Sequence, residues 1–245
     1  ALSRASVQQY LDRRRPGSNK LGTPRREGDK VVFVSGLYAE DHDALLGGAE
    51  IATYVEDDEV RTPGYETGFT TGEPIAAVVL SAAKRSADYA QFLGSTGDVR
   101  PGHTDLVKHY KSRGFVDPRG GGRSSFRSTI SDVIGGSVAR LFLEAQFGTL
   151  VFTSICQVGE LLAEKRLADV VEAELAQSSD GRMSASVASN IEQRLESGPM
   201  RSIDPVFAKQ AAEVLDRTRR DGDSVGAAVE IVAVHVPPLA GEPLY

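Results

Sequence analysis

The sequence predicts a chain of mixed helices and strands, and three observations carry this prediction. Its 245 residues, 40% of them hydrophobic, can bury a sizeable core in one or two domains. Between residues 130 and 145, apolar side chains recur at the spacing of one helix face, which predicts a helix over Thr129–Phe147. Other apolar residues form runs of strand length, at Val31–Val34, Ile75–Leu80, Leu150–Val158 and Val225–Val236.

Three further helical segments are indicated by helix-forming residues between turn signals. Turns that contain Pro, Gly or Asp end or interrupt each of them. They are Leu2–Arg15, Glu160–Leu195 with a break at Ser178–Gly181, and Asp204–Arg219. The charge pattern of the second one is typical of a solvated helix and shows no catalytic spacing.

Composition argues against several classes of protein. The net charge is -6 and the pI is about 5.3, which is not the charge of a general nucleic-acid-binding surface. Cys156 is the single cysteine, so no internal disulfide forms, and a buried thiol is favoured over a nucleophile. The longest uncharged run, Ala145–Gly159, is too short and too polar to span a bilayer, and no signal peptide precedes Arg4. We therefore expect a soluble, cytoplasmic protein.

Positive charge is concentrated in one stretch, Arg100–Arg127. This stretch contains seven Lys and Arg residues and two His residues, within a chain that is acidic overall. A local cationic cluster in an acidic protein indicates a small anionic ligand rather than a nucleic acid.

The second half of this stretch has the composition of an anion site. Gly120–Gly122 allow the backbone to approach a ligand closely, and Ser124 and Ser125 supply hydroxyl donors. The predicted helix follows directly, and the first N–H groups of a helix attract negative charge. A plain surface loop leading into a core helix fits the composition equally well. Arg123 and Arg127, four residues apart at the helix entrance, favour a bound anion.

Four blocks of the sequence resemble the chorismate synthase family. RPGHTD at Arg100 and RGGGRSSFRST at Arg119 are similar to the family's RPGHAD and RGGGRSSARET. LDRRRPG at Leu11 with TPRREGD at Thr23, and GDSVGAAVEIVAVHVPPLAGEP at Gly222, resemble further family blocks in the same order. The resemblance implies an α+β fold, a sandwich of central helices between antiparallel sheets, and a homotetramer.

The resemblance also implies roles for residues at matching positions. The residues implied to bind the phosphate and carboxylates of the substrate are Arg13, Arg14, Arg15, Lys20, Arg25 and Arg127. Lys20 stands where the family often has arginine, so it keeps the charge but lacks the planar fork. Arg123, Ser124 and Ser125 match the family's FMN-contacting RSS. Without the resemblance, the N-terminal arginines would fit a solvated face.

His103 is the predicted catalytic residue. A histidine between Gly102 and Asp105, on a flexible turn beside a carboxylate, suits proton transfer near neutral pH. A lone histidine is more often a satisfied surface residue, but the family's histidine in this block lies near the flavin and moves a proton. His42 has no second cluster of ligands around it, so no metal site is predicted.

The chain departs from the family in three places. Glu40–Phe69 is acidic and lies where bacterial members pass almost directly between two blocks, so we expect an inserted hairpin or lobe in a single domain over residues 1–245. A block with a second histidine would precede Ala1, and blocks that complete the flavin pocket would follow Tyr245. We therefore expect a fragment or a shortened relative, incomplete at both ends, with weak or absent activity by itself.

The reaction implied by the resemblance is that of the shikimate pathway enzyme. It converts 5-enolpyruvylshikimate 3-phosphate to chorismate and phosphate by an anti 1,4-elimination, with reduced FMN and no net redox change. NADPH would reduce the flavin in bifunctional relatives. Several guanidinium groups suit a trianionic substrate, because each charge-assisted hydrogen bond contributes about 1.5–3 kcal/mol.

Two other classes of function stay open. One is a non-catalytic relative that keeps the anion pocket and serves as a binding or partner subunit. The other is a nucleic-acid-binding module built on the basic stretch, against which the acidic pI weighs.

Overall fold

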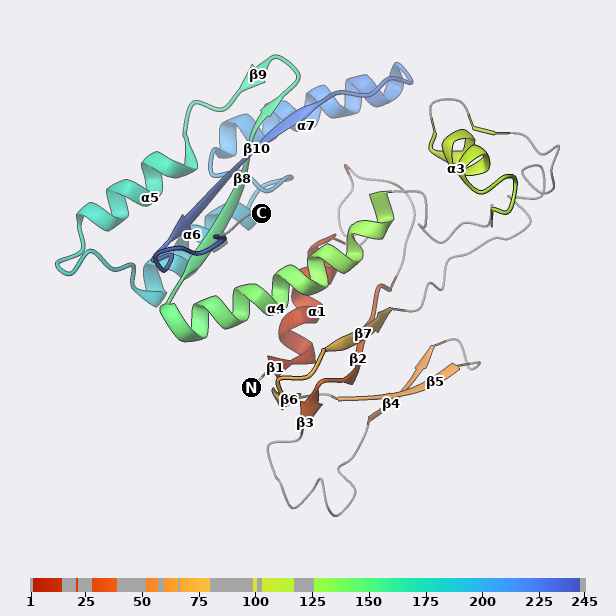
Figure 1. Cartoon of the computed structure of the whole chain (residues 1–245). Helices are drawn as coiled ribbons and strands as arrows, with labels where there is room; N and C mark the ends of the chain where they lie inside the picture. Colours follow the sequence, from red (N-terminus) through yellow and green to blue (C-terminus); the bar gives the residue numbers. More distant parts are fainter. Residues whose placement is uncertain are drawn as a thin grey trace. The chain divides into compact units, whose positions relative to one another are not determined.

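The computed structural model describes residues 2–14, 21, 28–38, 52–56, 60–65, 67–79, 99–100, 103–116 and 126–242. The chain forms two compact units: unit 1 combines Ala1–Ser18 with Pro24–Val138, and unit 2 combines Asn19–Thr23 with Ala139–Tyr245. Both contain helices and small antiparallel sheets (Figure 1), which confirms the α+β class. The single domain over residues 1–245 stays a prediction.

Unit 1 combines helices with short strands. Its helical elements are α1 (Arg4–Arg14), α3 (Asp105–Lys111), the 3-10 helix η2 (Phe126–Thr129) and the first part of α4 (Ile130–Phe147). Its strands are β1 (Leu2–Ser3), β2 (Val31–Ser35), β3 (Leu37–Tyr38), β4 (Ala52–Glu56), β5 (Val60–Gly64), β6 (Thr67–Thr70) and β7 (Ala76–Val79). They form three antiparallel sheets, in the orders β1-β6-β3, β2-β7 and β4-β5. The β4–β5 hairpin lies within residues 40–69, where an inserted hairpin or lobe is predicted.

Helix α1 packs on strand β2 because both present apolar side chains to each other. Val7 and Leu11, four residues apart and so on one face of α1, are fully buried, as are Val31 and Phe33 of β2. Gly36 turns the chain from β2 into β3 with φ +83°, and a Cβ there would lie 2.6 Å from the carbonyl oxygen of Pro74. Only glycine fits this turn without displacing its neighbour.

Unit 2 is built on one antiparallel sheet. Its strands are β8 (Leu150–Val158), β9 (Leu161–Leu162) and β10 (Ala227–Val234), in the order β10-β8-β9. The second part of α4 and helices α5 (Leu167–Ala176), α6 (Ala185–Glu196) and α7 (Pro205–Arg220) complete it (Figure 1). The main core cluster consists of Phe152, Leu167, Val171, Ile191, Leu195, Ile203 and Val234, and a second cluster joins Val158 to Met200, Phe207, Ala208 and Ala211.

Asp204 connects two parts of unit 2 through its buried carboxylate. Oδ1 accepts hydrogen bonds from the backbone N–H groups of Val206 (3.0 Å) and Phe207 (3.1 Å), which caps α7. Oδ2 accepts from the backbone N–H groups of Glu164 (3.1 Å) and Lys165 (3.2 Å), between β9 and α5. Burial alone would raise the pKa of Asp204, but the backbone N–H groups outweigh it and the pKa is lowered.

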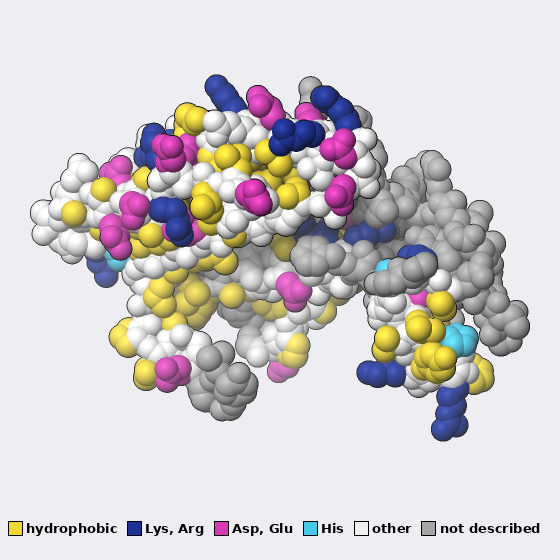
Figure 2. All heavy atoms as spheres, turned by 90° about the horizontal axis from the view of Figure 1, so that it is seen from above, with side chains coloured by type: hydrophobic (Ala, Val, Ile, Leu, Met, Phe, Trp, Pro, Cys, Tyr) yellow, Lys and Arg dark blue, Asp and Glu magenta, His cyan; other side chains and the backbone are white. Residues whose placement is uncertain are grey.

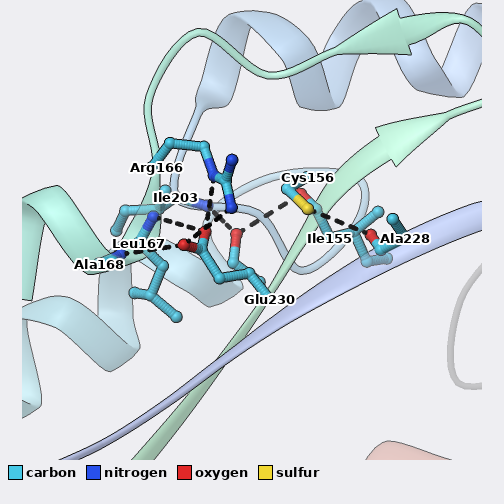
Figure 3. A network of polar contacts seen from close by, with 9 residues as sticks. Ile155, Cys156, Arg166, Leu167, Ala168, Ile203, Ala228 and Glu230 are labelled. Atoms are coloured by element: carbon cyan, nitrogen blue, oxygen red, sulfur yellow. Dashed lines mark hydrogen bonds and ion pairs between the residues drawn. The ribbon is translucent and has the colours of Figure 1, made fainter.

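Glu230 caps helix α5 from the neighbouring strand β10 (Figure 3). The side chain of Arg166, the residue before α5, makes no capping hydrogen bond. Instead, Glu230 accepts from the backbone N–H groups of Leu167 (2.8 Å) and Ala168 (3.3 Å), and its Oε1 lies 3.2 Å from Nη2 of Arg166. Burial would raise the pKa of Glu230, but Arg166 and the two N–H groups lower it further than burial raises it.

Strand β10 lies at the edge of its sheet and alternates in exposure along its length. Glu230, Val232 and Val234 point to the side of the sheet on which the core is built. Val229 and Ile231 point to the other side and are 58% and 67% exposed. The outward row of β10 is therefore apolar and open to solvent in unit 2.

Most of the predicted elements are confirmed. Strand β8 has the predicted bounds, and α7 begins at Pro205 behind its Asp204 cap. The prediction of a helical stretch from Glu160 is wrong at its start, because Leu161–Leu162 pair with the end of β8 and α5 begins at Leu167. Across the described ranges, no helix combines the length and apolar character needed to cross a bilayer.

Candidate functional site

Arg14 joins the two cationic regions of the sequence. It lies in the last turn of α1, and its Nη1 is 3.2 Å from Oδ2 of Asp29. Its Nη2 donates to the main-chain oxygen of Arg127 at 2.8 Å and lies 3.5 Å from Oγ1 of Thr129. Arg127 and Thr129 belong to η2, which ends directly before α4. The N-terminal arginine block and the entrance of α4 are therefore in direct contact.

Asp29 and Gln8 fix the direction of Arg14. The Asp29 side chain is 8% exposed, and its backbone has φ +43°, a left-handed conformation that Asp tolerates better than most residues. Nε2 of Gln8 donates to the carbonyl oxygen of Asp29 at 3.2 Å, and Oε1 of Gln8 accepts from the N–H of Val31 at 3.0 Å. Gln8 thus fastens α1 to the start of β2, so that the Asp29 carboxylate faces the Arg14 guanidinium.

The guanidinium of Arg14 still has donors for an anion. Of its five N–H groups, three are directed at Asp29, Arg127 and Thr129. Within the ranges that the structure describes, Nε–H and one Nη1–H have no partner. The side chain is 18% exposed. Arg14 is therefore held in position by the protein and keeps two donors for a ligand.

Arg13 and Arg127 differ from Arg14 in their surroundings. Arg13 is exposed, and its guanidinium carbon lies 5.6 Å from the centre of the Tyr10 ring, a cation–π contact on the surface of α1. The side chain of Arg127 is half-buried in η2. Neighbouring arginines of the N-terminal block therefore have different environments, which the sequence alone did not distinguish.

His103 lies beside Asp105, as its sequence context suggested. Nδ1 of His103 is buried and lies 2.8 Å from Oδ1 of Asp105, although the N–H is not aligned for a linear hydrogen bond. Arg100 donates to the same carboxylate through Nε (2.5 Å to Oδ2) and Nη2 (2.8 Å to Oδ1). The hydrogen bond from Arg100 lowers the pKa of Asp105 to about 2, so the carboxylate is ionised at neutral pH.

Six predicted site residues lie outside the described residues: Arg15, Lys20, Arg25, Arg123, Ser124 and Ser125. Their roles stay predictions, as does the glycine loop at residues 120–122. Among the residues whose positions are described, no group of three or more His, Cys, Asp or Glu side chains could hold a metal ion. The structure brings Arg14 and Arg127 together and places His103 with Arg100 and Asp105.

Asp29 and Gln8 were not among the site residues predicted from the sequence. Asp29 is the last residue of the TPRREGD block, so its place in that block was a usable signal. Gln8 had no such signal, because its role depends on the backbone of β2 lying beside α1.

The comparisons with known proteins agree with one another. The family model described as chorismate synthase matches residues 1–67 and 46–245. A curated relative named chorismate synthase from Rhodopirellula baltica is 57% identical over 244 residues, which is 100% of this chain and 57% of the relative. A second, from Methylobacterium nodulans, is 35% identical over 244 residues and 52% of its own length. The chain thus spans about half the length of the curated relatives it matches.

A solved structure described as chorismate synthase supports the same conclusion for the fold. It matches 96% of this chain and 50% of its own chain with a TM-score of 0.51, at 19% identity. Together the two stretches matched by the family model cover all of the sequence. The chain belongs to the chorismate synthase family.

Proposed function

We propose that this chain carries the anion-binding part of a chorismate synthase, a lyase that acts on 5-enolpyruvylshikimate 3-phosphate. The reaction is an anti 1,4-elimination that releases phosphate and gives chorismate without net redox change. The observation that supports it most is the hydrogen bond from Arg14 to the main chain of Arg127, because it joins two cationic blocks at one helix entrance. Relatives named as the enzyme match the whole chain, which favours catalysis over a non-catalytic binding role.

The substrate carries a phosphate and two carboxylates, which guanidinium groups would hold. Arg14, oriented by Asp29, would offer its two remaining donors, and Arg127 would add a second cation near the same helix entrance. Guanidinium groups near the leaving phosphate stabilise the charge that develops as the allylic C–O bond breaks. The proposed set of substrate-binding residues is completed by Arg13, Arg15, Lys20 and Arg25.

Reduced FMN is the proposed cofactor. Arg123, Ser124 and Ser125 would hold it, because a guanidinium and two hydroxyl groups are donors suited to a phosphate-bearing flavin. The helical turn η2 begins at the next residue, Phe126, so these donors precede a helix entrance. When bound, the flavin supplies transient electron density for the elimination. NADPH would serve to reduce the flavin in a bifunctional enzyme.

His103 is the proposed catalytic residue, and its task is to hold and move a proton. The ring is 25% exposed, so one part of it is open while Nδ1 is buried against Asp105. An imidazole with one part of its ring open and one nitrogen beside a carboxylate can accept and pass on a proton.

The proposed assembly is a homotetramer in the cytoplasm, on the strength of the family resemblance. Its proposed partner is the small phosphorylated substrate, and neither a nucleic acid nor a membrane. On the largest described part of the face that Figure 2 draws, acidic and basic side chains are interspersed, and the net charge is -6. Mixed charge there and an acidic chain weigh against nucleic-acid binding.

Anaerobic turnover of the enolpyruvyl substrate with dithionite-reduced FMN tests the proposal in the protein that carries this chain. We expect His103→Ala to lower kcat by about 100-fold or more, because a positioned proton-transfer group contributes about 10²–10⁴-fold. We expect Arg127→Ala to raise KM and lower kcat/KM by about 10–100-fold, equivalent to one lost charge-assisted contact.

The matched control is Asp169→Asn, which removes an exposed charge from α5 and should leave turnover unchanged. Protein that binds the substrate yet forms no chorismate under these conditions would contradict the proposed enzyme and support a binding subunit.

A further inference from the structure

The carboxylate of Asp105 is held in place by Arg100. The guanidinium donates to both carboxylate oxygens, at 2.5 and 2.8 Å, which is a bidentate contact. The backbone N–H of Arg100 also lies 3.4 Å from Oδ2. Two contacts to two oxygens fix the plane of a carboxylate as well as its position. The side chain of Asp105 is 19% exposed, so water competes only weakly for its contacts with Arg100.

The ring of His103 lies against this fixed carboxylate. Nδ1 of His103 is buried and lies 2.8 Å from Oδ1 of Asp105. A bare ring nitrogen carries a partial negative charge, which the anionic oxygen at that distance repels. A proton on Nδ1 converts the contact into an attraction, even though the N–H is not aligned for a linear hydrogen bond. In the described part of the chain, no other polar group partners Nδ1.

We propose that Asp105, clamped by Arg100, is a positioning residue that fixes neutral His103 as the Nδ1–H tautomer. In a neutral imidazole one nitrogen carries the proton and the other accepts, so this tautomer leaves Nε2 as the acceptor. Nε2 is then the nitrogen that receives a proton during the reaction. This last step rests on the proposed function, whereas the tautomer itself does not.

Nitrogen NMR of the histidine rings tests the tautomer directly. The probe is the full chain labelled with ¹⁵N-histidine, and the tautomer is read from spectra at alkaline pH in which the rings are neutral. His103→Gln identifies the His103 signals. We expect a protonated Nδ1 and a bare Nε2 for His103. His235 is an internal reference, because its Nε2 accepts from the N–H of Met183 at 3.0 Å and it should show the same tautomer.

Substitution of Asp105 then tests whether its carboxylate determines the tautomer of His103. Asp105→Asn should convert His103 to a mixture rich in the Nε2–H form, while His235 stays unchanged. Asp105→Glu keeps a carboxylate and should restore the Nδ1–H form at least in part. An unsubstituted protein in which His103 is already Nε2–H would overturn the proposal, whatever the substitutions do to α3.

Steady-state kinetics test the consequence for catalysis. Asp105→Asn should lower kcat by about 10–100-fold, as for other groups that orient a reacting residue, and leave KM for the phosphorylated substrate within about threefold. A rise in KM with an unchanged kcat would overturn the positioning role of Asp105. If the unsubstituted protein makes no chorismate, the proposed function fails, and the NMR result still decides the tautomer.

Discussion

Replacing Asp204 with alanine is expected to lower the free energy of unfolding by about 4 kcal/mol. The carboxylate is 3% exposed and accepts four backbone hydrogen bonds, from the first turn of α7 and from the segment between β9 and α5. Loss of a helix cap costs about 0.5–2 kcal/mol, and each buried donor left without a partner costs about 1–3 kcal/mol. Urea unfolding followed by far-ultraviolet circular dichroism measures the change.

Acid should remove part of this stabilisation from the unsubstituted protein. The pKa of Asp204 is lowered from its ordinary value of 3.8, so at acidic pH the unfolded state binds this proton more readily than the folded state. The contribution of Asp204 is complete above the unfolded pKa and disappears as the pH falls through the folded one. In Asp204→Ala this part of the acid dependence should be missing.

Two variants define what the Asp204 experiment means. Asp204→Asn keeps one acceptor oxygen but turns the other into a donor, so we expect about half the loss. Asp169→Asn removes an exposed carboxylate and should change stability by less than about 0.5 kcal/mol. A loss below about 1 kcal/mol in Asp204→Ala would contradict the connecting role of this residue.

Arg14→Met is expected to destabilise unit 1 by about 3 kcal/mol and to weaken binding of phosphorylated ligands. The substitution keeps an apolar stem but removes a cation that lies 3.2 Å from the buried carboxylate of Asp29. Removing one partner of a buried ion pair costs about 3–5 kcal/mol of stability. The side chain of Arg14 is 18% exposed, so we expect a loss at the lower end of this range. The main-chain oxygen of Arg127 also loses its donor, so the entrance of α4 is less firmly held. Thermal unfolding and phosphate titration measure the two effects.

A double substitution distinguishes two causes of the stability loss in Arg14→Met, the broken ion pair and the loss of packing. Because Asp29→Asn removes the charge that Arg14 neutralises, Arg14→Met with Asp29→Asn should be more stable than Arg14→Met alone. Arg13→Met on the same helix removes an exposed guanidinium and should cost less than about 1 kcal/mol. Equal losses for Arg13→Met and Arg14→Met would show that the contacts of Arg14 contribute little.

The fold could be predicted where apolar residues follow a regular period. Strand β8 and helix α4 each have a long run of such residues, and both were found close to their predicted bounds. Strand β9 has two residues and exists because they pair with the end of β8, which no local pattern reports. Helix α3 buries no side chain fully, so no apolar stripe marked it in the sequence.

The candidate site was predictable only as far as blocks of sequence could be matched. Arg14 and Arg127 were selected by resemblance, but their contact spans 113 positions and follows from how α1 meets the start of α4. The separation of Arg13 from Arg14 depends on which face of α1 is buried. The left-handed backbone of Asp29 is set by Gln8 and β2, so its role as the anchor of Arg14 required the structure.

Strand β10 also has a practical consequence for handling the chain. Among the described residues, no strand pairs with the outer edge of β10, so its backbone groups beside Val229 and Ile231 are a template for strand addition. The one acidic side chain of β10, Glu230, faces the core and does not place a charge on that edge. Concentrated samples should therefore self-associate through this strand. The outer edge of β10 would then limit the solubility of the chain more than the charged helices do.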